Sequence, residues 1–340
     1  MNYKIKHGTV NIFYILFVAA LSFSGVARVY ASDNFFVGLS SVKARSVAMG
    51  GAFTAVQDGF AAWEFNPAGA GFYVEGQSKS FDFTLYFNVM GPGILLENKS
   101  QLKDGLFFLG TLVKGFTAQV GPFSIGGVFG EELLTDHSHL KRPRILSSGS
   151  YLDQRNSSLG VALGLGGRVS IGVSAEVFKR PGDHRDKYKI GYRYGVQVKT
   201  RSDIDIGLFF CDLPADAEYD RLPIERFADE TLNLGVAYHP SRWMTLSLDI
   251  RNVSDENKSA LREPHAGLEL KPVNFLSLRG GYFRDKEKTN WLSGGIGLGR
   301  PKTRYNDSFW KHVRFDGTLL IEKTKVRQNR WWFFTTVLSW

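Results

Sequence analysis

Apolar side chains recur at every second position in one segment of this sequence after another. Between residues 313 and 319, for example, Val313, Phe315 and Leu319 alternate with Arg314 and Asp316. A period of two places alternate side chains on opposite faces of a β-strand. Similar segments begin at residues 81, 159, 169, 190, 204, 232, 244, 266, 276, 292, 313 and 332, and the less regular region 104–130 is expected to hold the rest. The total is about 14 antiparallel strands, an even number that is typical of bacterial membrane barrels.

The composition argues against helices as the membrane-spanning elements. No run of about 18 consecutive apolar residues, the length that a spanning helix needs, occurs after residue 31. Yet 43% of the residues are hydrophobic, and the chain holds 27 Phe and 37 Gly. A soluble β-sandwich would have similar totals, so the strand pattern decides. In a barrel the apolar faces meet lipid, the polar faces line the lumen, and no strand edge is left unpaired. The charged residues expected in the lumen are Asp82, Asp249, Glu269, Arg279 and Arg314.

The final segment carries the clearest alternation. Trp332, Phe334, Thr336, Leu338 and Trp340 stand at every second position. This segment resembles the last strand of bacterial outer-membrane barrels, which the barrel-insertion machinery reads by a final aromatic residue and alternating apolar residues. The resemblance implies that Phe334, Leu338 and Trp340 form the assembly signal.

The lengths of the connections between segments also alternate. If Trp340 lies on the periplasmic side, most connections on that side are short, and most on the outer side are longer, polar and charged. This asymmetry is typical of outer-membrane barrels. The short connections are 166–167, 199–203, 239–242 and 271–274, and the outer ones are 131–156, 180–187, 211–229, 252–262, 284–289 and 323–330. The connection 300–311 is long but falls on the periplasmic side, which suggests a miscounted strand nearby.

The first 31 residues have the features of a cleavable signal peptide. Lys4 and Lys6 precede the apolar stretch 10–23, and the segment closes on the small residue Ala31. A basic start, a short apolar core and a small residue before the cleavage point are what a secretory signal needs. The apolar core is shorter than the ~20 residues of a spanning helix. We expect the mature chain to begin at Ser32 and to reside in the bacterial outer membrane.

Charge limits the class of partner. Cleavage removes three basic residues, Lys4, Lys6 and Arg28, and no acidic one, so the formal net charge falls from +9 to +6. This value gives no reason to expect nucleic-acid binding. The basic clusters 137–144 and 179–187 stand on expected outer loops, where they either bind lipid and lipopolysaccharide phosphates or are simply solvated. A single cysteine, Cys211, excludes an intramolecular disulfide and a multi-cysteine metal site.

Residues 32–77 do not have the pattern of strands. The run 44–56 mixes small residues with isolated apolar ones, and Gly50-Gly51 would weaken a helix there by about 1 kcal/mol per glycine. A compact element of small residues fits inside a barrel lumen, where bulky side chains would collide with the wall. The expected organisation is therefore a signal peptide at 1–31, a plug at 32–77 and a barrel at 78–340.

A rigid turn is expected within this plug. Pro67 fixes its own φ and moves Asn66 out of the helical region. An Asn side chain can also bond to its own backbone two residues on. The turn consists of Asn66, Pro67, Ala68 and Gly69.

The stretch from Lys43 to Tyr73 contains ARSVAMGGAFTAVQD at 44–58 and WEFNPAG at 63–69. It resembles the opening of the FadL-like outer-membrane superfamily. The wording is closer to the PorV-like branch, whereas the Asn-Pro-Ala turn is shared with the fatty-acid transporters. The pieces HAGLE at 265–269 and LRGGY at 278–282 also resemble that branch. The chain departs from it at Gly59, where the branch often has a second acidic residue, and in its loops after residue 291.

The resemblance implies an architecture and two alternative functions. The plug would be a hatch inside a barrel of about 14 strands. Its rearrangement would let a hydrophobic small molecule, such as a long-chain fatty acid, pass a gap in the wall and enter the membrane laterally. The PorV-like branch implies instead a barrel that binds exported proteins and serves secretion or surface attachment. Phe53, Phe60, Trp63 and Phe65 could contact a hydrophobic ligand, or they could wedge the plug against the wall.

No catalytic or cofactor site stands out in the sequence. Two histidines in Asp136–His139 could bind a metal, but one short loop rarely closes a coordination shell. The glycine-rich run 295–299 lacks the Gly-Lys-Ser/Thr and the following helix of a nucleotide site. We therefore expect no enzymatic activity, no cofactor and no metal.

Overall fold

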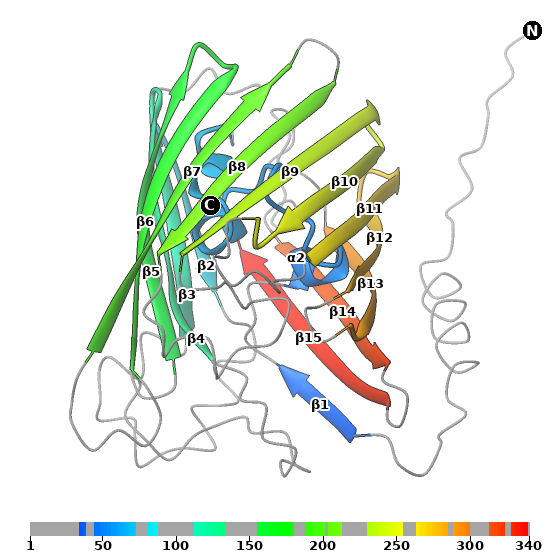
Figure 1. The fold of residues 1–340 in the computed structure, drawn as a ribbon. Helices are drawn as coiled ribbons and strands as arrows, with labels where there is room; N and C mark the ends of the chain where they lie inside the picture. The colour runs from blue at the N-terminus through cyan, green and yellow to red at the C-terminus, as the bar shows by residue number, and fades with distance from the viewer. Residues whose placement is uncertain are drawn as a thin grey trace, which may run out of the picture. The chain divides into compact units, whose positions relative to one another are not determined.

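We analysed a computed structural model of the chain, shown in Figure 1. The residues that it describes are 34–38, 44–72, 81–87, 112–132, 155–179, 188–200, 203–212, 230–253, 263–284, 288–299, 313–323 and 328–338. The signal peptide 1–31, the basic cluster 137–144, most of the cluster 179–187 and Trp340 lie outside these ranges. All described residues belong to one structural unit, Asn34–Trp340. Among the residues that the structure describes, no helix combines the length and hydropathy needed to cross a membrane.

One continuous sheet forms most of this unit. Strands β2 to β15 follow one another in the sheet in the same order as in the sequence, and each pairs antiparallel with the next. The 14-stranded antiparallel barrel expected from the period of two is therefore confirmed. The strands are β2 (Phe81–Phe87), β3 (Val113–Val120), β4 (Phe123–Glu132), β5 (Arg155–Leu165), β6 (Val169–Lys179), β7 (Tyr188–Lys199), β8 (Ile204–Asp212), β9 (Glu230–Ser241), β10 (Met244–Arg251), β11 (Glu263–Val273), β12 (Leu276–Arg284), β13 (Asn290–Gly299), β14 (Val313–Lys323) and β15 (Gln328–Leu338).

The two ends of the sheet meet where β15 lies against β2. A fifteenth strand, β1 (Asn34–Gly38), pairs with β15 at this place, and its direction is parallel. The expectation that residues 32–77 contain no strand was wrong for these five residues. A strand this short has almost no sequence signal of its own, and its partner lies at the other end of the chain.

The apolar side chains of the strands point away from the lumen. On β10, Leu246, Leu248 and Ile250 are 36%, 64% and 46% exposed, whereas Ser247 and Asp249 on the opposite face are buried. A soluble barrel has the reverse arrangement, because water would expel the apolar face. An apolar exterior around a polar lumen fits a lipid environment.

The charged residues expected in the lumen are found there. Asp82, Asp249, Glu269 and Arg279 are buried. Arg314 is bonded through Nε to the buried Asp316 at 2.6 Å. These positions confirm that the register of the strands, and not only their existence, follows from the sequence.

The short connections lie where they were expected, with small shifts. The three residues Gly166, Gly167 and Arg168 join β5 to β6, and the two glycines have φ of +59° and +69°, which glycine adopts readily. Strand β9 continues to Ser241 and β11 to Val273, so their turns are shorter than expected. The suggestion that a strand was miscounted near 300–311 was wrong, because β13 pairs directly with β14 over Asn290–Gly299. This long connection therefore joins its strands at the short-turn end of the barrel.

The plug lies inside the ring of strands. It contains the short helix α2 (Ala44–Ala48) and two 3-10 turns, η1 (Ala61–Glu64) and η2 (Pro67–Phe72). In Figure 1 these elements appear in blue between the green and the yellow-to-orange walls. Across 44–72, only Arg45, Gln57 and Gly71 are more than marginally exposed. Most of 44–72 is therefore buried, and the role of 32–77 as a plug or hatch stays a prediction.

Candidate functional site

The backbone of the plug is held by side chains of the barrel wall. Little of the plug is regular helix, so many of its carbonyl and N–H groups need partners from elsewhere. Strand side chains supply them: Thr318 donates to the carbonyl of Ala44 at 2.6 Å, and Ser293 donates to that of Ala48 at 3.1 Å. Further donors are Thr117 to Gly59 at 2.8 Å, Ser174 to Trp63 at 3.1 Å and Ser124 to Ala70 at 3.1 Å. Polar side chains of the wall therefore bind the backbone of the plug at several positions.

Asp249 of β10 fixes the centre of the plug. Its Oδ2 accepts hydrogen bonds from the backbone N–H groups of Phe53 and Thr54, both at 2.8 Å. Close by, Arg251 donates to the carbonyl of Gly51, and Nδ1 of His265 lies 2.6 Å from the carbonyl oxygen of Gly50. A buried carboxylate that accepts two backbone N–H bonds makes strong, charge-assisted contacts.

Glycine residues, which have no side chain, let the backbone of the plug approach the backbone of the wall closely. At Gly281 of β12, an added Cβ would collide with the backbone nitrogen of Gly50. At the preceding residue, Gly280, the side-chain direction points outward and nothing lies within 4 Å. At Gly195 of β7, a Cβ would collide with the side chain of Asn66. The HAGLE and LRGGY pieces of the sequence are thus wall segments that contact the plug.

Arg45 is the main ionic link between the plug and the wall. Its guanidinium donates to both carboxylate oxygens of Glu269 on β11, at 3.0 and 2.8 Å, and to Oδ2 of Asp58 at 2.7 Å. Asp58 belongs to the plug, and its Oδ1 also accepts the N–H groups of Phe60 and Ala61. One arginine therefore ties two distant parts of the plug to one strand.

The link continues along the wall as alternating charges. Arg279 of β12 bridges Glu269, at 2.7 Å, and Asp316 of β14, at 2.5 Å. Arg314 also binds Asp316 and interacts electrostatically with Asp58, which brings the chain of charges back to the plug. We call these six residues the charge ring: Arg45, Asp58, Glu269, Arg279, Arg314 and Asp316.

The two members of the charge ring that belong to the plug, Arg45 and Asp58, stay ionised. Burial works to lower the pKa of Arg45, but Glu269 and Asp58 raise it overall. Burial works to raise the pKa of Asp58, but Arg45 and Arg314 lower it below the ordinary value. Both groups therefore stay charged across the neutral range, and the pairing persists.

The turn around Pro67 has the geometry expected from the sequence. Asn66 is buried, its Nδ2 donates to the carbonyl of Thr54 at 2.7 Å, and its Oδ1 accepts the N–H of Ala68 at 3.1 Å. The N–H of Gly69 donates to the carbonyl of Asn66 at 2.9 Å. The turn therefore joins two parts of the plug in addition to reversing the chain.

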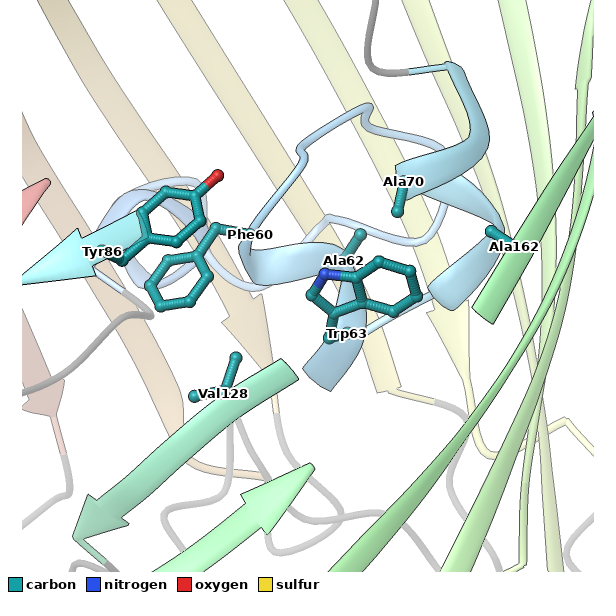
Figure 2. Packing of buried hydrophobic residues seen from close by; sticks show 7 residues of the cluster. All are labelled: Phe60, Ala62, Trp63, Ala70, Tyr86, Val128 and Ala162. Atoms are coloured by element: carbon teal, nitrogen blue, oxygen red, sulfur yellow. The ribbon is translucent and has the colours of Figure 1, made fainter. Parts of the chain in front are cut away.

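The four aromatic residues singled out from the sequence are all buried between plug and wall. Phe53 and Phe65 pack against each other, with ring centroids 5.4 Å apart. Figure 2 shows Phe60 stacked on Tyr86 of β2, at 3.7 Å between centroids, and Trp63 beside Ala62, near the wall. All four are at most 4% exposed. They fill the interface between plug and wall, and their contact with a ligand stays a prediction.

An aromatic cluster inside β12–β15 was not identified from the sequence. It consists of Phe283, Trp291, Leu320, Trp331 and Phe333, together with Ala44 and Val47 of α2. We call it the lumen cluster. His265, Phe283 and Trp291 form a continuous stack within and beside it, with interplanar angles of 7°. The signal was present in the unbroken run Trp331–Phe334, where aromatic residues occupy both faces of a strand whose inner face should be polar.

Comparison with known proteins gives distant similarities to solved structures alone. No protein-family model and no curated protein matches it. Among solved structures it is similar to a triple mutant of the Rhodopseudomonas blastica porin, with a TM-score of 0.34 and 10% identity over 66% of this chain and 76% of the porin. It is also similar to a variant of OccD1 (OprD), with a TM-score of 0.33 and 11% identity over 66% and 67% of the two chains. The strand order, the apolar exterior and the polar lumen described above are those of a bacterial outer-membrane β-barrel.

Proposed function

We propose that this barrel passes hydrophobic small molecules, of the long-chain fatty-acid type, across the outer membrane. The observation that carries the proposal is the lumen cluster. Inner faces of membrane barrels are ordinarily polar, but β12 to β15 present Phe283, Trp291, Leu320, Trp331 and Phe333 to the lumen. An apolar strip of this kind offers a hydrophobic molecule contacts that water does not.

The plug argues against free diffusion of hydrated solutes. Its backbone is bonded to side chains from many strands, and the aromatic residues Phe60 and Trp63 fill the space between η1 and the wall. A polar solute would have to displace these contacts without replacing them. An apolar molecule could instead replace the apolar contacts of α2 with the lumen cluster, since Ala44 and Val47 belong to both.

The charge ring is consistent with a plug that changes position when a ligand binds. Burying an ion pair costs about as much as the pairing returns, so we take the charge ring to specify the position of the plug more than to stabilise the fold. Arg45 lies in α2, the same helix that contacts the lumen cluster. A ligand that moves α2 would therefore also disturb the pairing of Arg45 with Glu269. The sequence resemblance to FadL-like barrels supports the same reading.

The test measures uptake of labelled palmitate by cells that make the protein. Leu320→Ala and Phe283→Ala remove inner apolar surface and should lower uptake several-fold with the barrel assembled. Their neighbours Leu319 and Tyr282 face outward, so Leu319→Ala and Tyr282→Ala are matched controls that should keep uptake at the wild-type level.

The secreted-protein profile of the same strains is measured in parallel. If palmitate uptake by the wild type stays at the background of cells without the protein, the transport proposal is wrong. A secreted-protein profile that then depends on the barrel would favour the PorV-like role, in which the barrel binds exported proteins.

A further inference from the structure

The place where the sheet closes differs from every other strand contact in the barrel. Strands β2 and β15 are the first and last strands of the antiparallel series. Strand β1 pairs with the free edge of β15, whereas the corresponding edge of β2 has no ladder in the described part of the chain. Among the described residues, β15 and β2 are in contact, but no backbone ladder joins them. We call this contact the seam.

Strand β1 covers the first half of β15 along the seam. Asn34 to Gly38 pair in sequence with Asn329 to Phe333. Figure 1 shows β1 beside the start of β15. The edge of β15 is therefore closed there by a segment from the far end of the chain, and not by the neighbouring strand of the barrel.

We propose that residues 34–38 are a removable seal, whose departure from β15 opens the seam between lumen and lipid. This inference rests on the proposed function, and it assigns the place where a hydrophobic molecule leaves the lumen. The occupant of the seam in the closed state is β1 itself, and in the open state it is the hydrophobic molecule.

The pairing of β1 is the easiest in the wall to break. It is parallel and only five residues long, and parallel pairing is somewhat weaker per residue than antiparallel pairing. The neighbouring pair β14–β15 instead has eleven paired residues and a connection of four residues, 324–327. Removal of any strand from β3 to β14 would break two antiparallel ladders, whereas removal of β1 breaks one short parallel ladder.

The lumen cluster lies directly behind this seal. Two inner-facing residues of β15 in this stretch, Trp331 and Phe333, are the register partners of Phe36 and Gly38. An opening at 34–38 would thus lead from the apolar strip inside the barrel to the lipid outside. At Trp331 and Phe333 the inner face of β15 is aromatic, so at these two positions the lumen side of the opening is apolar.

The seal is also coupled to the charge ring through the chain. Only five residues, 39–43, separate the end of β1 from the start of α2. Helix α2 carries Arg45, and its Ala44 carbonyl is bonded to Thr318 of β14. A displacement of α2 that breaks these bonds would pull on β1, so movement of the plug and opening of the seam form one event.

A reversible tether tests the seal. Val37 and Trp332 are register partners, so Val37→Cys with Trp332→Cys, in a Cys211→Ala background, should form a disulfide that fixes β1 to β15. A control pair in the same background, Leu278→Cys with Ile296→Cys, joins two outward positions of β12 and β13, away from the seam. Palmitate uptake is measured for both proteins, oxidised and then reduced.

The proposal expects the oxidised tether at the seam to abolish uptake, reduction to restore it, and the control disulfide to leave it unchanged. Equal uptake in the oxidised and reduced seam variant would overturn the seal while leaving the transport function intact. Absence of uptake even in the reduced and wild-type proteins would count against the transport function instead.

Hydrogen exchange of the purified barrel tests the seal without any transport. Those backbone amides of 329–333 that point toward β1 should exchange about tenfold faster than the amides of 317–321 on β14, and the oxidised tether should remove this difference. Equally slow exchange in both segments of the untethered protein would overturn the seal, whatever the uptake assay shows.

Discussion

Glu269 and Arg279 face each other in register across β11 and β12, and their ion pair of 2.7 Å is the point at which Arg45 attaches the plug. The two wall residues come from the HAGLE and LRGGY pieces of the sequence, and Arg45 comes from the N-terminal motif. Three segments that look unrelated along the chain therefore build one structural joint. The charge ring around this joint decides how firmly the plug is held.

We expect Arg45→Gln to release the plug from the wall. It leaves Glu269 and Asp58 buried with fewer positive partners, and breaking a buried ion pair by removing one partner costs about 3–5 kcal/mol. The measurement is limited proteolysis of the purified barrel, which should become sensitive within 44–72. Lys271→Gln is the control, because Lys271 lies 3.4 Å from Glu269 but its side chain is 44% exposed. A plug as protease-resistant in Arg45→Gln as in the control would show that the charge ring does not hold it.

The adjacent glycines Gly281 and Gly280 test the close contact between plug and wall, because only Gly281 faces the plug. Gly281→Ala would place a methyl group against the backbone of Gly50, so we expect it to displace the plug and lower the free energy of unfolding by about 1–3 kcal/mol. Gly280→Ala points into open space and should change stability by no more than about 0.5 kcal/mol. Urea unfolding followed by tryptophan fluorescence measures both. Equal effects would mean that the close approach of plug and wall is not maintained in solution.

The attachment of the plug should resist mild acid. Because Arg45 and Arg314 lower the pKa of Asp58, its stabilising contribution is complete above its ordinary pKa of 3.8 and is lost only as the pH falls through the lower folded value. Protease resistance of the plug should therefore be constant from neutral pH to about pH 5 and should fall only in stronger acid. In Asp58→Asn this part of the acid dependence should disappear. Loss of resistance already near pH 6 in the wild type would contradict the assignment.

The orientation of the wall toward lipid is tested by a charge on its outer face. Leu248 is 64% exposed in the middle of β10, so Leu248→Arg should destabilise the folded barrel by about 2–4 kcal/mol in a bilayer. Trp243 lies in the short turn before β10, and Trp243→Arg should cost no more than about 1 kcal/mol. Folding into lipid vesicles at increasing urea gives both values. Similar values would mean that Leu248 does not face the bilayer core.

The sequence predicted the wall well, since lipid outside and polar groups inside impose one period on every strand. For Leu246 and Asp249, the face of the strand could be predicted from the alternation alone, without knowing which strands lie beside β10. Phe334 is exposed on the outer face of β15, as the alternation requires, although the proposed role of Phe334, Leu338 and Trp340 in assembly remains a prediction. The turn at Asn66 was also predictable, because the conformation of Pro67 is local.

The contacts of the plug could not be predicted in the same way. The pairing of Arg45 with Glu269 joins residues far apart in sequence, and only the closed barrel brings them together. Strand β1 was missed because its partner on β15 lies at the opposite end of the chain. The lumen cluster was missed because its wall residues on β12 to β15 are apolar at positions where the inner face of a membrane barrel is ordinarily polar.

The central claim, that 44–72 close the lumen of this barrel, is tested most directly by conductance in planar bilayers. The wild-type protein should show little or no steady conductance, and deletion of 44–72 should give a stable pore, once its heat-modifiable mobility on gels confirms an assembled barrel. Gly281→Ala, which keeps the full chain, should show intermittent openings that Gly280→Ala lacks. A wild-type barrel that conducts as steadily as the deletion variant would contradict the account.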